Sequence, residues 1–145
     1  MYEHLLVPVD GSELSDRAMA ASIELARKLG ARITGFIAEP FATPPPGIGL
    51  GYGAAVTQQD QTAQGHARTV LSRFERLCDE AGVAFAPCTT QASHIDDAII
   101  DAAREKGCDM IVMVTHGRGV LGELMWGSHA KNLLSRCKVP LLVLH

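Results

Sequence analysis

The residues best suited to chemistry lie at two glycine-rich points in the last third of the chain. His116 and Gly117 follow an apolar run, and after nine intervening residues Gly127, Ser128 and His129 open a helical segment. A helix that begins just after a glycine presents unpaired N–H groups and the positive end of its dipole. Residues 115–138 carry four basic residues and one acidic residue in a chain of net charge -3. The pattern favours an anion site, and the alternative is a simple turn with Ser128 as a helix cap.

The sequence supports neither of two common nucleotide-binding motifs. Residues 117–122 read GRGVLG, the GxGxxG pattern of dinucleotide-binding folds, but they follow the fourth expected strand rather than the first. No acidic residue lies about twenty positions later to hold a ribose, so an NAD site is disfavoured. The chain also lacks GxxxxGK[ST], the motif of phosphate-loop ATPases. No third ligand accompanies His116 and His129, which argues against a metal site.

Alternating strands and helices must position these residues. Apolar runs predict strands, and periodic segments closed by glycine predict helices. Because the expected strands are mostly unbroken apolar runs, we predict an α/β domain with a parallel sheet covered on both faces. Strands are expected at 5–9, 33–38, 83–88, 110–114 and 140–144, and helices at 13–29, 58–80, 96–106 and 128–137.

Residues 39–57 interrupt this alternation with a long loop inside a single domain that spans residues 1–145. Four of the seven prolines and four of the fourteen glycines fall in this stretch. Such a composition predicts neither a helix nor a central strand. Long loops in small domains are binding lids or surface excursions, and the sequence favours neither.

The composition narrows the class of protein. With 47% hydrophobic and 20% charged residues the chain is typical of globular domains. The net charge of -3 disfavours a nucleic-acid partner. No apolar stretch approaches the ~20 residues that span a bilayer, and the N-terminus lacks a signal-peptide pattern. The four cysteines form no CxxC pair. This favours reduced thiols in a cytoplasmic protein over disulfides.

Several separated motifs make the chain resemble the universal stress protein family. The nucleotide-binding branch of that family carries G-x-x-G, nine residues and then G-[ST]. Gly117 and Gly127-Ser128 match this pattern in type and spacing, whereas Val114 replaces the first glycine. The motifs are LLVPVDGS at 5–12, SHIDDAIIDAA at 93–103, DMIVMVTHGRG at 109–119 and GSHAKNLLSRCKVPLLVLH at 127–145.

The resemblance implies an adenine nucleotide α-hydrolase-like fold with a five-stranded parallel sheet in the order 3-2-1-4-5. It implies ATP as the ligand, with or without Mg²⁺, bound where the first and fourth strands end. The implied contacts are Pro8, Val9 and Asp10 beside the adenosine, Ile37 and Met113 against the adenine, and His116, Gly117, Gly127, Ser128 and His129 at the phosphates, with Val114 at the substituted position.

Structural roles are open for several of these residues. Asp10 precedes the first helix and can act as a cap, and Ile37 and Met113 are typical core residues. Val114 either obstructs the ligand or points into the core. His66, with the histidines outside the motif, is interpreted as structural or solvated.

The sequence therefore predicts an ATP-binding regulatory or stress-response protein with little or no catalytic turnover. The family order places residues 140–145 on a sheet edge, and the resemblance implies a homodimer paired through this strand. One alternative is a dimeric scaffold of the same family that does not bind nucleotide. A second alternative is a slow ATP hydrolase.

Overall fold

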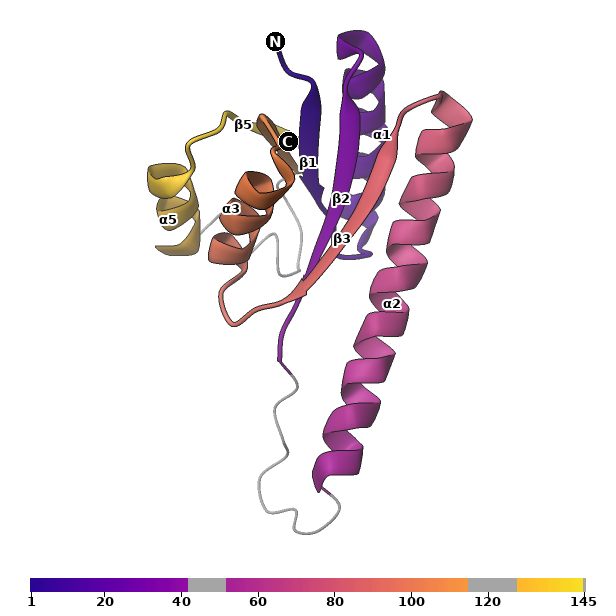
Figure 1. Ribbon diagram of the computed structural model, residues 1–145, viewed down its shortest axis with the longest axis vertical. Coiled ribbons are helices and arrows are strands. Elements are labelled where there is room, and N and C mark those ends of the chain that lie inside the picture. The colour runs from indigo at the N-terminus through magenta and orange to yellow at the C-terminus, as the bar shows by residue number, and fades with distance from the viewer. Residues whose placement is uncertain (42–51, 115–127, 145) are drawn as a thin grey trace.

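Strand-length apolar runs alternate with glycine-terminated helices, and the chain folds into one sheet with helices on both faces (Figure 1). The computed structural model describes residues 1–41, 52–114 and 128–144. The strand pairs are all parallel, in the order β3-β2-β1-β4-β5, which confirms the predicted fold class. The elements are β1 (His4–Pro8), α1 (Glu13–Leu29), β2 (Arg32–Glu39), α2 (Tyr52–Ala81), β3 (Phe85–Gln91), α3 (Ile95–Lys106), β4 (Met110–Val114), α5 (Ser128–Arg136) and β5 (Leu141–Leu144).

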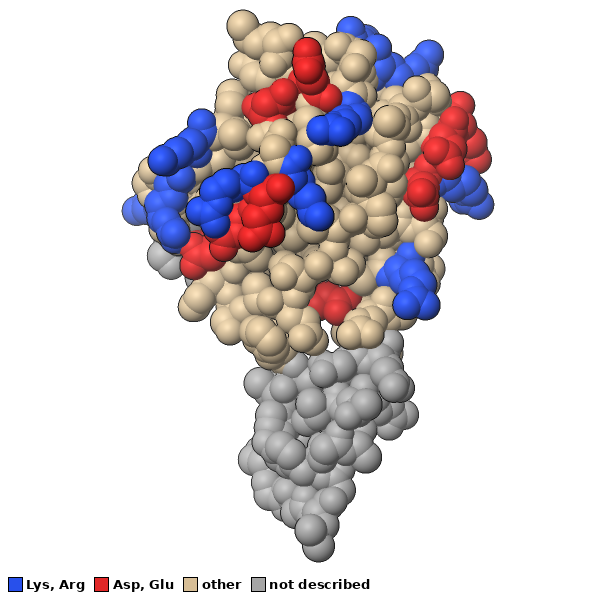
Figure 2. All heavy atoms as spheres, viewed as in Figure 1, with Lys and Arg blue, Asp and Glu red and all other residues tan. Residues whose placement is uncertain are grey.

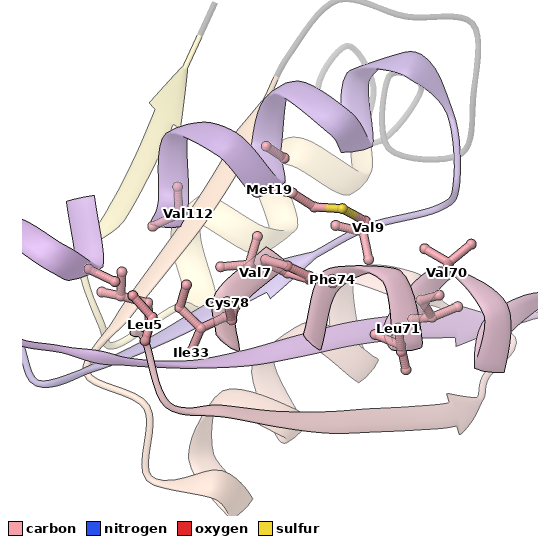
Figure 3. Packing of buried hydrophobic residues seen from close by; sticks show 14 of the residues in the cluster. Leu5, Val7, Val9, Met19, Ile33, Val70, Leu71, Phe74, Cys78 and Val112 are labelled. Atoms are coloured by element: carbon pink, nitrogen blue, oxygen red, sulfur yellow. The ribbon is translucent and has the colours of Figure 1, made fainter. Parts of the chain in front are cut away.

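Alternation of side chains along the strands divides the core into two clusters. Leu5 and Val7 of β1 belong to the cluster under α1 and α2, whereas Leu6 belongs to the cluster under α3 and α5. Phe74 of α2 is fully buried in the first cluster, close to Val7 (Figure 3). Full burial of such a side chain contributes roughly 1.5–3 kcal/mol to stability. The sheet is therefore held from both sides, and its strand ends are fixed.

Strands β3 and β5 form the two edges of the sheet. Ile33 N donates to Ala84 O and Ala92 N donates to Glu39 O, so the even-numbered residues of β3 bond with β2. The intervening residues direct their backbone groups towards the open edge. Pro87 is one of these outward-facing residues. Proline has no N–H, so β3 loses no hydrogen bond with β2 at this position, but its outer edge has one donor fewer.

Some boundaries differ from the sequence expectations. Helix α2 begins at Tyr52, so the loop predicted over 39–57 is too long, and Glu39 ends β2. Residues 42–51 of that loop lie outside the described residues. The helix extends further because Ala and Gln after Gly53 favour it, and one interior glycine costs a helix only about 1 kcal/mol. The N-cap of α3 is His94.

The four cysteines, all within the described part of the chain, are free thiols. Burial raises the pKa of Cys78 to about 12 and that of Cys108 to about 11, so both remain neutral. None of the helices described is both long and apolar enough to cross a bilayer.

Candidate functional site

The strand order makes β1 and β4 neighbours where the chain changes direction across the sheet. From β1 the chain continues through α1 to β2, whereas β4 continues towards α5 and β5 on the opposite side. Open parallel sheets bind ligands beyond the carboxyl ends of such strands. Val9 and Asp10 follow β1 there, and Val114 ends β4. These residues form the described part of the candidate site.

The Asp10 carboxylate organises the turn between β1 and α1. Its Oδ1 accepts hydrogen bonds from the Ser12 backbone N–H at 3.0 Å, the Ser12 hydroxyl at 2.5 Å and the Ser15 hydroxyl at 2.7 Å. In return, Ser15 Oγ accepts from the backbone N–H groups of Asp10 at 2.8 Å and Gly11 at 3.1 Å. Ser12 is the N-cap of α1 but makes no side-chain cap bond itself. Asp10 thus organises the turn before the helix, whereas the N-cap position that the sequence allowed it belongs to Ser12.

The same hydrogen bonds fix the charge of Asp10. Burial favours the neutral acid, but the donors from Ser12 and Ser15 favour the carboxylate and hold the pKa of Asp10 below its ordinary value. Asp10 is therefore ionised at neutral pH. Among the described residues every donor to this carboxylate reaches Oδ1. Oδ2 can accept from a ribose hydroxyl or hold a cation.

Most of the expected adenosine contacts are core residues. Val9, Ile37 and Val114 are at most 5% exposed and lie in the cluster beneath α1 and α2. Met113 is 1% exposed and lies in the opposite cluster, so it and Ile37 point to different faces of the sheet. Pro8 is buried at the end of β1. A ligand therefore reaches this region at the strand ends rather than along either face.

The expected phosphate contacts fall mostly outside the described residues. His116, Gly117 and Gly127 lie there, and Arg118 lies there too. Helix α5 begins at Ser128, as predicted, with His129 as its second residue. Nothing further is described for the side chains of these two residues.

Two side-chain bonds between α3 and α5 orient that helix. Asn132 Nδ2 donates to Asp96 Oδ2, and Arg136 pairs with Asp97 Oδ1. Asp96 is only 2% exposed. These bonds hold the middle and the end of α5 on the α3 side of the sheet.

The local positive charge is smaller than the sequence count suggests. Figure 2 shows the Lys and Arg side chains over α3 and α5 lying beside Asp and Glu side chains. Arg136 is paired with Asp97 in this way. Of the basic residues described here, Arg136 is thus partly neutralised, whereas Lys131 and Lys138 are exposed to solvent.

Sequence reasoning missed Ser15 and His66. Ser15 is 1% exposed on the inner face of α1, and a buried hydroxyl inside an apolar period must find a partner. That rule was the available signal. His66 of α2 places its Nε2 3.3 Å from Asp10 O, although it is separated from Asp10 by 56 positions. No local pattern indicates this contact.

A groove of about 600 Å³ between α2 and β3 lies apart from this site. It is lined by polar side chains such as Arg68 of α2 and Thr89 of β3, and by none of the predicted site residues. Among the described residues no group of three His, Cys, Asp or Glu side chains is placed to hold a metal. The candidate site remains the region beyond the ends of β1 and β4, where a cation would be shared between Asp10 and ligand oxygens.

The strand order and the helices on both faces define a doubly wound parallel α/β protein, and comparisons with known proteins narrow this class further. The family model described as the universal stress protein family matches residues 1–145. Universal stress protein YxiE of Bacillus subtilis is 26% identical over 96% of this chain and 97% of its own length. This chain belongs to the universal stress protein family.

Solved structures agree with this assignment. A universal stress family protein from Burkholderia pseudomallei superimposes with a TM-score of 0.77 at 26% identity, covering 99% of this chain and 96% of that one. A family member from Arabidopsis thaliana, solved with AMP bound, superimposes with a TM-score of 0.68 at 16% identity, covering 98% of this chain and 90% of that one. The second likeness establishes the shared fold alone.

Proposed function

We propose that this chain binds an adenine nucleotide, ATP, and acts as a regulatory stress-response protein through binding and dimerisation rather than through turnover. The observation that carries the proposal is the ionised Asp10 carboxylate, oriented by Ser12 and Ser15 at the β1 end. It lies beside the strand that leads into the segment from Gly117 to Ser128. The Oδ2 atom of Asp10 would accept from the ribose or from an adenine edge.

Phosphate binding is assigned to the start of α5. One charge at a helix terminus gains only ~0.3–1 kcal/mol, whereas micromolar affinity requires about 8 kcal/mol. Several backbone and hydroxyl donors and the burial of adenine must supply the rest. Gly117 and Gly127 suit this because a Cβ would prevent close approach of the backbone to a phosphate. The AMP-bound relative supports the choice of ligand class.

Mg²⁺ would arrive with the triphosphate. The described site offers the Asp10 carboxylate, and Mg²⁺ commonly takes one or two carboxylates with phosphate oxygens and water. The ion would neutralise phosphate charge, while Asp10 would orient the nucleotide. We assign no catalytic role to either.

Calorimetric titration with ATP tests the proposal. The wild-type chain should bind, Gly127→Val should abolish binding, and Ser128→Ala should weaken it by about 1 kcal/mol, the net value of one hydrogen bond. Gly65→Val is the matched control, since a Cβ at Gly65 on α2 meets nothing within 4 Å. It should bind ATP as the wild type does.

Two results would contradict the proposal. One is the absence of heat from the wild type at high micromolar ATP, which would favour the scaffold that does not bind nucleotide. The other is equal weakening by Gly65→Val and Gly127→Val. Mass spectrometry of natively purified protein gives an independent test, because a retained adenine nucleotide would be seen directly.

Dimerisation is proposed through β5. This edge strand, Leu141–Leu144, is only partly buried in the single chain, and an apolar open edge favours pairing with another strand. Gel filtration with light scattering should give twice 15.5 kDa. A monomer at micromolar concentration would contradict this part. We also propose a cytoplasmic location, which the free thiols support.

A slow ATP hydrolase is the competing function. Hydrolysis requires a positioned water and charge stabilisation beyond phosphate binding. Phosphate release faster than about one turnover per minute, lost in Asp10→Ala, would favour the hydrolase.

A further inference from the structure

The peptide bond between Asp10 and Gly11 is held at both ends by different helices. On one side Gly11 N donates to Ser15 Oγ of α1 at 3.1 Å. On the other side Asp10 O lies 3.3 Å from His66 Nε2 of α2. A carbonyl oxygen only accepts, so the imidazole donates through its Nε2–H. The two bonds fix the direction of this peptide plane.

Gly11 makes this control necessary. Its φ of 84° lies in the left-handed region, where a glycine tolerates rotation of the preceding peptide at little cost. Rotation would turn the carbonyl away from His66 and the N–H away from Ser15, so both bonds would be lost together. His66 and Ser15 therefore favour the peptide orientation that the structure shows.

Helix α2 covers the turn closely. A Cβ on Gly11 would lie 2.8 Å from His66 Nε2 and 3.0 Å from Val70 Cγ2. The imidazole itself is exposed, so its role is not to fill the core. Its Nε2 is directed at the backbone carbonyl of Asp10.

The direction of this peptide determines where the Asp10 carboxylate points. Asp10 N also bonds Ser15 Oγ, at 2.8 Å, and the Ser15 hydroxyl bonds Asp10 Oδ1. Rotation of the Asp10–Gly11 peptide would therefore disturb the network that orients the carboxylate. We propose that His66 is a positioning residue of the nucleotide site, which holds the Asp10–Gly11 peptide from α2 and so keeps Asp10 directed for ligand binding. This inference rests on the proposed function.

A second polar contact between α1 and α2 provides a control. Arg73 Nη1 lies 2.8 Å from Asp16 Oδ1, and both side chains are about half exposed. This pair ties the same two helices together without touching the turn. Loss of either contact would weaken the packing of α2 against its neighbours. Only loss of the His66 contact would free the Asp10–Gly11 peptide to rotate.

The experiment compares His66→Ala, His66→Gln and Arg73→Ala with the wild type. The first measurement is the ¹H–¹⁵N signal and hydrogen-exchange rate of the Gly11 amide without ligand. In His66→Ala the exchange should become about threefold to tenfold faster, the range expected for one net hydrogen bond. His66→Gln, whose amide nitrogen reaches the position of Nε2, should restore the wild-type rate. Arg73→Ala should leave it unchanged.

The second measurement is the Kd for ATP of the same proteins. His66→Ala should raise the Kd about threefold to tenfold, and His66→Gln and Arg73→Ala should stay within about twofold of the wild type. An unchanged Gly11 amide in His66→Ala would overturn the inference, as would an equal change in Arg73→Ala. The Gly11 amide could respond as expected while neither the wild type nor any variant binds ATP. That result would support the orientation of the Asp10–Gly11 peptide by His66 and would contradict the proposed nucleotide function.

Discussion

Val114→Gly restores the glycine that the nucleotide-binding motif carries and removes a buried side chain. Val114 ends β4, is 5% exposed and belongs to the cluster beneath α1 and α2. Because its side chain points into the core, it does not stand between the strand end and a ligand. We therefore expect Val114→Gly to destabilise the fold without tightening the binding of ATP.

The expected loss can be worked from this burial. Truncation of a buried valine to alanine costs about 1–3 kcal/mol, through lost transfer free energy and the cavity left behind. Glycine at a strand position costs about 0.5–1 kcal/mol more, because it adds freedom to the unfolded chain. The free energy of unfolding should therefore fall by about 2–4 kcal/mol. At about 2–4 °C per kcal/mol for a chain of this size, Tm should fall by about 5–15 °C.

The assay combines thermal denaturation with calorimetric titration of ATP on the wild type, Val114→Ala and Val114→Gly. Val112→Ala is the matched control, since Val112 lies on the same strand in the same cluster at 0% exposure. The two alanine variants should lose similar stability, and all the variants should bind ATP as the wild type does. A Val114→Gly chain with the wild-type Tm and a lower Kd would refute the reasoning, because Val114 would then obstruct the ligand.

Two further predictions concern the core. Burial and the Arg32 charge hold the pKa of His4 below its ordinary value of 6.5, against the opposing effect of Asp109. The unfolded chain therefore takes up this proton first, so the free energy of unfolding should decrease as the pH falls below 6.5. His4→Gln keeps a donor for Thr34 Oγ1 and should lessen this decrease, as measured by urea titrations at about pH 7.5 and about pH 5.5. An equal decrease in the free energy of unfolding in the wild type and in His4→Gln would contradict the assignment. Gly35→Ala would place a Cβ 2.7 Å from the Phe85 ring and 2.9 Å from Phe74, so it should cost about 1–3 kcal/mol in chemical denaturation. An unchanged denaturation midpoint would contradict this expectation, because the two rings would then move aside without loss of stability.

Helix α1 shows how far periodicity predicts a fold. Its bounds, Glu13–Leu29, are those expected, because Gly30 takes the left-handed conformation that ends a helix. The buried face differs from the expected one. Leu29 is 41% exposed, whereas Ser22 is fully buried. Helical spacing predicts an apolar side made of Leu14, Ala18, Ala21, Leu25 and Leu29, whereas the residues buried in α1 are Ser15, Ala18, Met19, Ser22 and Ala26, most of them small.

The candidate site was less predictable than the fold. Asp10 and the start of α5 are visible in the sequence because a strand end and a glycine mark them. The approach of His66 to Asp10 depends on how α2 packs over the turn, and no pattern in the sequence encodes that distance. The opposite directions of Ile37 and Met113 follow from the two-residue alternation of strands once their registers are known.

Pro87 on the outer side of β3 has a consequence for assembly. A sheet with two receptive edges can add a neighbour at each, and repeated addition gives an open ribbon. Here the β3 edge lacks one donor, whereas the β5 edge is an apolar strand. In the proposed two-fold pairing through β5 both chains would use the same edge, and the β3 edges would stay open with one donor missing at Pro87. Under that proposal Pro87 would hinder the addition of a third chain at β3, and its replacement is the change most apt to convert closed pairing into polymerisation.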